Sequence, residues 1–106
     1  MNKALWSQIK EKLEETKARE IVVLDVRKLS SMTDFIIIAT GSSDRQVRAI
    51  SEYLRENAGR PFSTEGAEEG RWVLMDYFDV IVHIFQDDVR RYYDIEGMWL
   101  NAKRLS

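Results

Sequence analysis

The sequence predicts a single-domain α/β sandwich with a mixed sheet, spanning residues 1–106. Helical and extended periodicities alternate in the order α-β-β-α-(β)-β-β-α, which is typical of helices packed on a sheet. Two β-branched runs are apolar at nearly every position, as expected for strands buried on both faces. The chain has 106 residues and is 44% apolar, which is enough for one modest core and too little for two.

The first predicted element is an amphipathic helix over about residues 3–18. Its apolar side chains form a single stripe: Leu5, Trp6, Ile9 and Leu13. Such a stripe needs an apolar surface to cover. The next two runs, "IVVLDV" (Ile21–Val26) and "FIIIAT" (Phe35–Thr40), are rich in β-branched residues and are predicted to be central strands, joined by a loop.

A second helix is predicted from about Asp44 to Ala58, ending before Gly59. Its apolar stripe consists of Val47, Ile50 and Leu54. Beyond it, "FSTEGAEEG" is either a short edge strand or a loop. Two strands, "RWVLMD" and "DVIVHIF", follow and are joined at Tyr77 and Phe78. A third helix over about residues 87–96 and an apolar tail, "GMWL", complete the chain.

Composition excludes several kinds of site. The chain has no cysteine, so it forms no disulfide, no thiolate zinc site and no cysteine nucleophile, and a cytoplasmic location is expected. The first twenty residues are charged throughout and lack the apolar core of a signal peptide. No run approaches the roughly 20 apolar residues that span a bilayer, so we expect no membrane partner.

Charge is distributed unevenly along the chain. The acidic segment, Pro61–Asp88, holds seven acidic residues and one arginine, a net charge of −6. It would repel a phosphate backbone and suits a basic partner, or it is a solvated acidic surface. The nearest basic face consists of Arg45, Arg48 and Arg55 on the second helix, which we interpret as solvated. No direct sequence-specific nucleic-acid partner is expected.

The loop between the second strand and the second helix raises the question of phosphate binding, because Gly41 and Ser42 stand at a helix N-terminus. Ser43 and Gln46 match a capping box, in which each residue satisfies an amide of the other. Asp44 stabilises the helix dipole but opposes a phosphate. No lysine follows, so the phosphate-loop pattern is absent. We therefore favour a capping role for this loop.

The alternative is a metal-dependent enzyme similar to a nucleotidyltransferase, which would use the Gly41-Ser42 loop. Two-metal chemistry needs carboxylates that converge on ions about 4 Å apart. No strand carries a D-x-D pattern, and the nearest acid pair, Asp76 and Asp79, is predicted to flank a turn in solvent. His83 has no evident serine or cysteine partner. We therefore predict no catalytic residue, no metal ligand and no cofactor.

The predicted hairpin carries the strongest indication of a binding site. With a two-residue turn at Tyr77 and Phe78, the cross-strand pairs are Asp76 with Asp79, Leu74 with Ile81, and Trp72 with His83. One face is aliphatic and forms core, whereas the other mixes aromatic, acidic and imidazole side chains, as interfaces do. Tyr77 and Phe78 are unusual turn residues, so they either fold back on the core or touch a partner. The predicted partner-binding residues are Trp72, Leu74, Asp76, Tyr77, Phe78 and His83.

Four blocks of the chain, in order, carry a family resemblance: "LDVRKLSSMTDFIIIATGSSDRQVRAI", "EG", "RWVLMDYFDVIVHIF" and "RRYYDIEGMW". The chain resembles the ribosomal silencing factor family, also called Iojap-related, over nearly its whole length. The resemblance implies a nucleotidyltransferase-like fold that lacks the catalytic acids. It also implies a translation repressor that binds the large ribosomal subunit through the basic β-barrel ribosomal protein numbered fourteen. Bound there, the repressor would block association with the small subunit when nutrients are scarce.

Several positions match the family pattern: Asp34, Gly41, Ser43, Glu65, Gly66, Trp72, Asp76, Asp79, His83, Arg90, Tyr93 and Trp99. Among these, Arg90 is expected to pair with Asp94 one helical turn later. The chain departs from the family at Phe78, where a small residue, usually glycine, precedes the aspartate. The apolar tail around Trp99 and Leu100 offers a surface for self-association, as a homodimer of the free protein.

Overall fold

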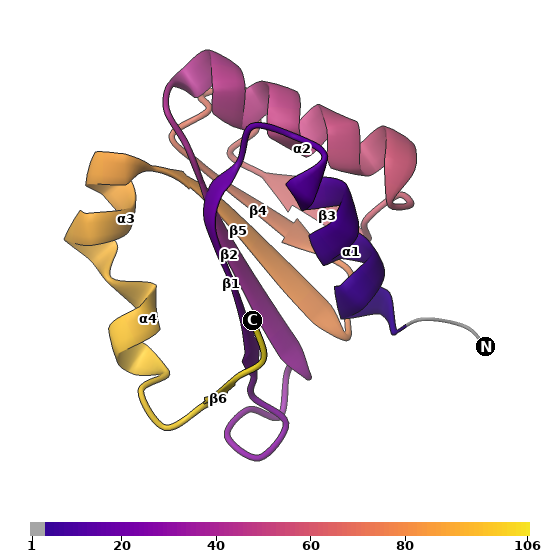
Figure 1. Ribbon diagram of the computed structural model, residues 1–106, viewed down its shortest axis with the longest axis vertical. Helices are drawn as coiled ribbons and strands as arrows, with labels where there is room; N and C mark the ends of the chain where they lie inside the picture. The colour runs from indigo at the N-terminus through magenta and orange to yellow at the C-terminus, as the bar shows by residue number, and fades with distance from the viewer. Residues whose placement is uncertain (1–3) are drawn as a thin grey trace.

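A six-stranded sheet with the strand order β3-β4-β5-β2-β1-β6 organises the fold in the computed structural model, which describes residues 4–106 (Figure 1). The strands are β1 (Arg19–Asp25), β2 (Phe35–Gly41), β3 (Ser63–Glu65), β4 (Trp72–Asp76), β5 (Val80–Gln86) and β6 (Lys103–Arg104). The central pair, β2 and β5, is parallel, and the other neighbours are antiparallel. The prediction of an α/β fold with a mixed sheet is therefore confirmed.

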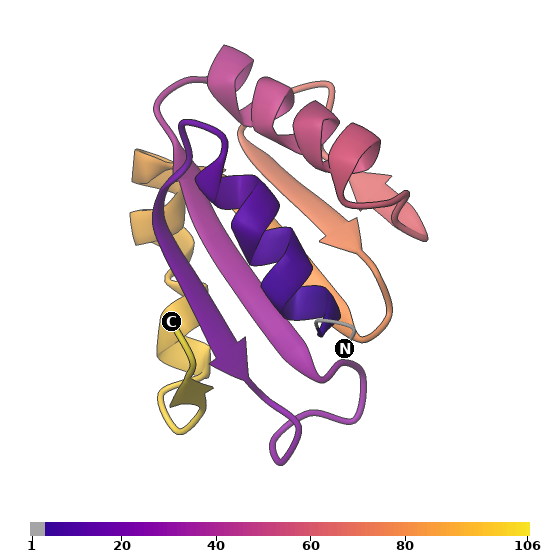
Figure 2. The ribbon, with the colours of Figure 1, turned by 45° about the vertical axis from the view of Figure 1, so that its right-hand side comes forward.

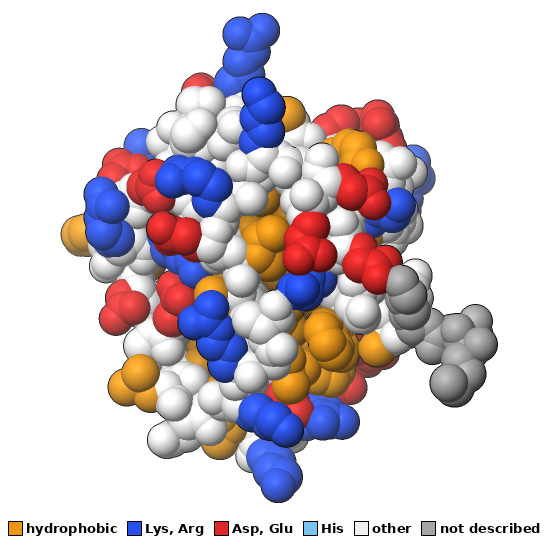
Figure 3. All heavy atoms as spheres, viewed as in Figure 1, with side chains coloured by type: hydrophobic (Ala, Val, Ile, Leu, Met, Phe, Trp, Pro, Cys, Tyr) orange, Lys and Arg blue, Asp and Glu red, His pale blue; other side chains and the backbone are white. Residues whose placement is uncertain are grey.

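Helices lie on both faces of this sheet (Figures 1 and 2). The two longer helices, α1 (Leu5–Glu14) and α2 (Asp44–Asn57), cover one face. The other face holds α3 (Asp87–Tyr93) and α4 (Ile95–Met98). Charged side chains of both signs lie on the outward surface of α1 and α2 (Figure 3). The predicted order of elements is confirmed as far as α3, and "FSTEGAEEG" contains a short edge strand, β3. The separate helix α4 and the strand β6 were not predicted.

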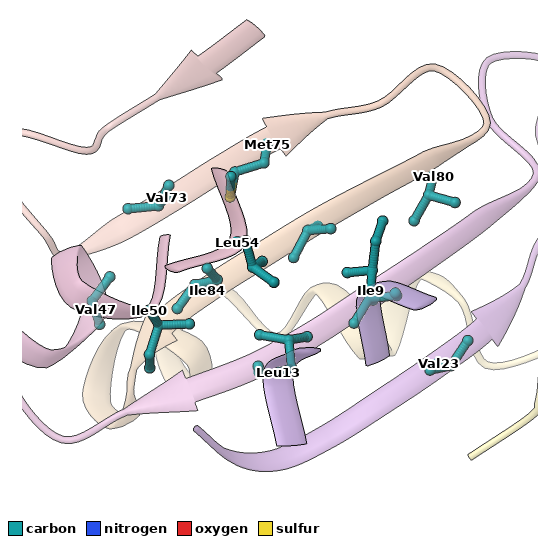
Figure 4. Packing of buried hydrophobic residues seen from close by; sticks show 13 residues of the cluster. Ile9, Leu13, Val23, Val47, Ile50, Leu54, Val73, Met75, Val80 and Ile84 are labelled. Carbon is teal, nitrogen blue, oxygen red and sulfur yellow. The ribbon is translucent and has the colours of Figure 1, made fainter. Parts of the chain in front are cut away.

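The larger core lies between the sheet and the two long helices (Figure 4). Ile9 and Leu13 of α1 and Leu54 of α2 have no exposed surface, and the predicted stripes therefore face the sheet. Beneath them lie Val23, Ile37, Val73, Met75, Val82 and Ile84. Each fully buried aliphatic side chain contributes roughly 1.5–3 kcal/mol to folding. These residues determine which face of each strand points inward.

The second core is smaller and covers only part of the opposite face. Val89 of α3 and Ile95 of α4 pack against buried residues of three adjacent strands: Val22, Leu24, Ile36, Ile38 and Phe85. From β4, only Trp72 joins this cluster, at its margin, together with Trp99 from the C-terminal tail. The half of this face formed by β4 therefore carries no comparable helical layer.

The predicted third helix, residues 87–96, is interrupted at Asp94, which adopts a left-handed conformation with φ of 43°. Aspartate tolerates this conformation better than most residues. The predicted pairing of Arg90 with Asp94 is wrong. The Arg90 guanidinium instead donates to the Glu96 carboxylate at 2.9 and 3.1 Å, to Thr40 Oγ1 at 2.6 Å and to the Glu20 carbonyl at 2.8 Å. This buried cation joins α3 and α4 to the sheet.

Candidate functional site

The β4–β5 hairpin turns at Phe78 and Asp79, one residue later than predicted. The Tyr77 amide donates to the Val80 carbonyl at 2.9 Å, which closes the hairpin around these two residues. The observed pairs are Asp76 with Ile81, Leu74 with His83, and Trp72 with Phe85. The predicted pairs are therefore wrong by two positions. Because side chains alternate with a period of two, a shift of two positions leaves every side chain on its predicted face.

Phe78 holds the turn in an unfavourable conformation. Its φ of 72° lies in the left-handed region, which glycine adopts without steric cost. Its amide donates to Asp76 Oδ1 at 2.7 Å, and the Asp79 amide donates to the Tyr77 carbonyl at 3.0 Å. Asp76 therefore does not face Asp79 across the strands, as predicted, but closes the turn. The positive φ at position 78 explains why a small residue such as glycine suits it.

The two aromatic residues of the predicted turn point in different directions. Tyr77 packs against the larger core, and its hydroxyl donates to the Gly59 carbonyl at 2.9 Å. Burial raises the pKa of Tyr77 to about 12. Phe78 is instead 62% exposed and packs against Phe62, with ring centroids 4.5 Å apart. Thus Tyr77 folds back on the protein, whereas Phe78 is free to touch a partner.

The face of the hairpin opposite the larger core, which we call the Trp72 face, consists of Trp72, Leu74, Asp76, Ile81, His83 and Phe85. The Trp72 ring lies 4.9 Å from the rings of Phe85 and of Tyr93. Its Nε1 donates to His83 Nδ1 at 3.0 Å, which places the remaining imidazole proton on Nε2. Burial lowers the pKa of His83 to about 4, so the ring is neutral at pH 7.

Leu74, Asp76 and Ile81 are half-buried, and exposed Glu65 extends this face onto the edge strand β3. A hollow beside the indole is lined by Gly66, Glu69, Arg71, Trp72, Val89 and Tyr93. A side chain at Gly66 would place its Cβ 2.1 Å from the Trp72 carbonyl oxygen, so glycine is needed for this close approach. The face thus combines a buried aromatic floor, half-exposed apolar side chains and an acidic rim.

The Gly41-Ser42 loop is occupied by its own hydrogen bonds. The Gln46 amide donates to Ser43 Oγ at 3.1 Å, which confirms the predicted cap. The Gln46 side chain accepts from the Ser42 amide at 2.6 Å rather than from the Ser43 amide, as a standard capping box would have it. A Cβ at Gly41 would lie 2.8 Å from Val47 Cγ2, so close packing on α2 explains the glycine. Nothing in the loop favours nucleotide binding.

Some acidic side chains elsewhere form local ion pairs. Arg27 donates to both carboxylate oxygens of Asp25, at 3.0 and 2.7 Å, and these bonds lower the pKa of Asp25 to about 2. Within residues 4–106, no three histidine, aspartate or glutamate side chains converge as a metal site would require. In the same range, no helix has the length and apolar character needed to cross a membrane.

The structure brings Trp72, Leu74, Asp76 and His83 together on one face, with Phe78 at its end and Tyr77 behind it. Sequence reasoning did not single out Tyr93 or Phe62 as neighbours of this site. Tyr93 is placed by α3, and Phe62 stacks on Phe78 through contacts distant in sequence. The aromatic character of "RPF" was the only local signal for Phe62.

A partly uncovered sheet face with aromatic side chains and a polar rim has the composition of a protein-binding surface. Comparison with known proteins is more specific. A family model described as "Ribosomal silencing factor during starvation" matches residues 2–106. The chain therefore belongs to the ribosomal silencing factor family.

Individual relatives agree with this assignment. Ribosomal silencing factor RsfS of Chromobacterium violaceum is 44% identical over 97 residues, which cover 88% of this chain and 80% of that protein. A crystal structure of a protein from Chromobacterium violaceum superimposes with a TM-score of 0.83 at 41% identity, over 90% of this chain and 82% of the other. A crystal structure from Bacillus halodurans gives a TM-score of 0.81 at 33% identity, over 99% of both chains.

Proposed function

We propose that this protein represses translation by binding the large ribosomal subunit and sterically blocking its association with the small subunit. The proposed contact is the basic β-barrel ribosomal protein numbered fourteen. Family membership supports a role at the ribosome. The observation that carries the proposal is the Trp72 face, whose β4 half lacks the helical layer that covers the opposite face of the same strands. A cytoplasmic location would follow, because ribosomal subunits join there.

The residues of the Trp72 face have different roles in this proposal. Leu74, Asp76 and Phe78 present accessible atoms to the partner. Trp72 and His83 form the floor, and their hydrogen bond holds the indole in place. Tyr77 positions the turn rather than making contact. Aromatic anchors of this kind dominate many interfaces, while the surrounding polar rim contributes less to affinity.

Charge supports a basic partner. Glu65 and Glu69 lie beside Trp72, within the acidic segment of net charge −6. Complementary charge of this kind accelerates encounter and orients the two surfaces before they touch. A standard interface buries roughly 1,600 Å² in total, which one sheet face and its flanking loops can supply. Occupying the surface of one subunit is sufficient to exclude the other, so the proposal requires no turnover.

Co-sedimentation with separated ribosomal subunits tests the proposal. We expect the protein to associate with the large subunit, and Trp72→Ala to weaken this binding by about 2 kcal/mol, or about thirtyfold. Trp6→Ala is the matched control, because Trp6 is a half-buried tryptophan that packs on the opposite side of the sheet. Leu74→Ala removes an accessible contact without disturbing the indole, which separates loss of contact from misfolding.

Association of the wild-type protein with neither subunit would contradict the proposed function. Binding by folded Trp72→Ala and Leu74→Ala proteins with wild-type affinity would remove the Trp72 face from the contact surface. If the wild-type protein binds neither subunit, its melting temperature should be measured with nucleotides and Mg²⁺ to test the Gly41-Ser42 loop, because a ligand that binds the folded state raises the melting temperature.

A further inference from the structure

We infer that one end of the molecule binds the phosphate backbone of ribosomal RNA next to the protein partner. We call this surface the basic end; it consists of Arg27, Lys28, Lys103 and Arg104. The inference rests on the proposed function, because it assumes that the protein docks on the large subunit. Figure 3 shows Lys and Arg side chains gathered at the lower edge of the molecule, where Figure 1 places the β1–β2 loop.

The sheet brings two distant segments together at this end. Strand β6 pairs with β1, with Lys103 opposite Asp25 and Arg104 opposite Leu24. Arg27 and Lys28 follow directly after β1, so the four bases share one sheet edge. A hollow between the two segments is lined by Asp25, Arg27, Lys28, Leu29, Asn101 and Lys103. The concentration of positive charge is therefore a product of the fold and not of a basic run in the sequence.

Part of this charge is available to a ligand. The pair formed by Arg27 and Asp25 is locally neutral. Within residues 4–106, neither Lys28 nor Lys103 forms an ion pair, and Arg104 donates only to the Ser106 carbonyl, at 3.0 Å. Nearby acids offset part of the remaining charge: Asp34 acts on Arg27, Asp25 acts on Lys103, and Glu96 acts on Arg104.

The arginines of α2 differ from those of the basic end. Arg48 pairs with Asp44 and Arg55 pairs with Glu52, each within one helical turn. The charge of these two arginines is therefore already compensated on the helix surface, and within residues 4–106 Arg45 is the one arginine of α2 without an ion pair. The basic end thus presents the stronger electrostatic attraction for a polyanion, because neutralising phosphates releases their counterions.

Apolar side chains lie beside these bases. Met32 is 85% exposed and Leu29 is 49% exposed, both in the β1–β2 loop, while Leu100 is 84% exposed before β6. Such side chains can contact riboses and base faces that a backbone-binding surface approaches. An anionic membrane would also attract a basic surface with exposed apolar groups. RNA is favoured here because the family is ribosomal and RNA surrounds ribosomal proteins.

The basic end is continuous with the proposed protein contact. The amides of Asp34 and Phe35 both donate to the Asp79 carbonyl at 3.0 Å, which ties the β1–β2 loop to the hairpin turn. Phe78, the exposed end of the proposed contact, is the neighbour of Asp79 in that turn. A partner docked across the turn brings the RNA beside it to the basic end, while the acidic segment faces the basic protein.

The salt dependence of binding to large subunits tests this inference. The variant carries Lys28→Ala, Lys103→Ala and Arg104→Ala. The matched control carries Lys12→Ala, Lys17→Ala and Arg45→Ala, which remove the same charge from α1, its C-terminal end and α2. Over about 50–200 mM salt, we expect the slope of log Kd against log salt to fall by about 2 in the variant, with about tenfold weaker binding at the lower end. The control should keep the wild-type slope.

A photo-reactive amino acid at Met32 identifies the molecule in contact. RNA adducts on large subunits would support the inference, whereas adducts to ribosomal proteins alone would overturn it. Charge-dependent binding of the wild type to phosphatidylserine vesicles, with an unchanged salt slope on subunits, would also overturn it in favour of a membrane. If Trp72→Ala weakens binding but the triple variant does not, only this inference fails. If the wild type does not bind large subunits, the proposed function fails with it.

Discussion

At the scale of single residues, His83 shows how burial converts a candidate catalytic group into a structural one. Its side chain is almost fully enclosed, and its Nδ1 accepts the indole proton of Trp72. A neutral ring is required for this hydrogen bond, because a protonated imidazole has no acceptor. Since the proposed anchor depends on this bond, the integrity of the Trp72 face is linked to the protonation of one histidine.

Folding stability should therefore fall in mildly acidic solution. The pKa of His83 is about 4 in the folded protein and about 6.5 when unfolded, so the unfolded chain binds the proton more readily. The stabilising contribution is complete above about pH 6.5 and is lost as the pH falls to about 4, a total of about 3 kcal/mol. Urea unfolding at about pH 7.5 and about pH 4.5 measures this change.

His83→Gln is the control for this prediction. Glutamine retains an acceptor for the Trp72 indole but does not titrate, and His83 is the only histidine in the chain. The variant should lose much less stability than the wild type between about pH 6.5 and 4, because the contribution of a carboxylate such as Asp25 is lost only as the pH falls below its unfolded pKa of 3.8. An equal loss of stability in both proteins would show that other groups cause the effect.

At the scale of elements, the β4–β5 hairpin combines a structural cost with a proposed function. A non-glycine residue with positive φ costs about 1–2 kcal/mol. Phe78 has this conformation, and its ring packs on another exposed ring, that of Phe62, rather than in the core. The hairpin therefore retains a strained aromatic residue in solvent, where neither the turn nor the core requires it.

Substituting Phe78 separates these two effects. Phe78→Ala and Phe78→Gly both remove the ring, but only glycine relieves the backbone strain. Allowing for the greater entropy of glycine in the unfolded chain, the Gly variant should be more stable than the Ala variant by about 1 kcal/mol in urea unfolding. Both should bind large subunits more weakly, to a similar extent. Equal stability of the two variants would show that Phe78 is not strained. Binding of both variants with wild-type affinity would exclude Phe78 from the contact.

At the scale of the whole molecule, the asymmetry of the two sheet faces underlies the proposed mechanism. One face is fully packed under α1 and α2, and the other is packed only where α3 and α4 reach. Arg90 secures that partial cover through Glu96 and Thr40. The remaining surface is built on paired strands, and a surface that is formed before binding limits the entropy lost on binding. Such a protein is suited to occupying a site rather than to repeated turnover.

Steric exclusion makes inhibition of subunit joining stoichiometric. With large subunits well above the dissociation constant, the fraction of joined ribosomes should fall in proportion to added protein and reach its minimum near about one copy per large subunit. The proportion should not change with incubation time. Light scattering or gradient sedimentation measures joining, with Trp72→Ala as the weaker-binding comparison. Progressive inhibition by a small fraction of protein would indicate catalysis and contradict the steric mechanism.

Features that depend on local sequence were predictable. Helix stripes such as Ile9 and Leu13, the buried strands, the Ser43 cap and the face to which Trp72 belongs follow from periodicity and capping chemistry, which neighbouring residues determine. The family resemblance could also be recognised from the sequence, because its four motif blocks are local stretches of the chain.

Only the tertiary structure decided the remaining features. These include the hairpin register, the break at Asp94, the partners of Arg90, the contact of Tyr93 with Trp72, and the two-residue strand β6. The sequence by itself determined the main helices and strands and which of their faces are apolar. It left open which distant groups meet, because contacts between segments far apart in the chain are selected by packing of the whole core and leave no local pattern.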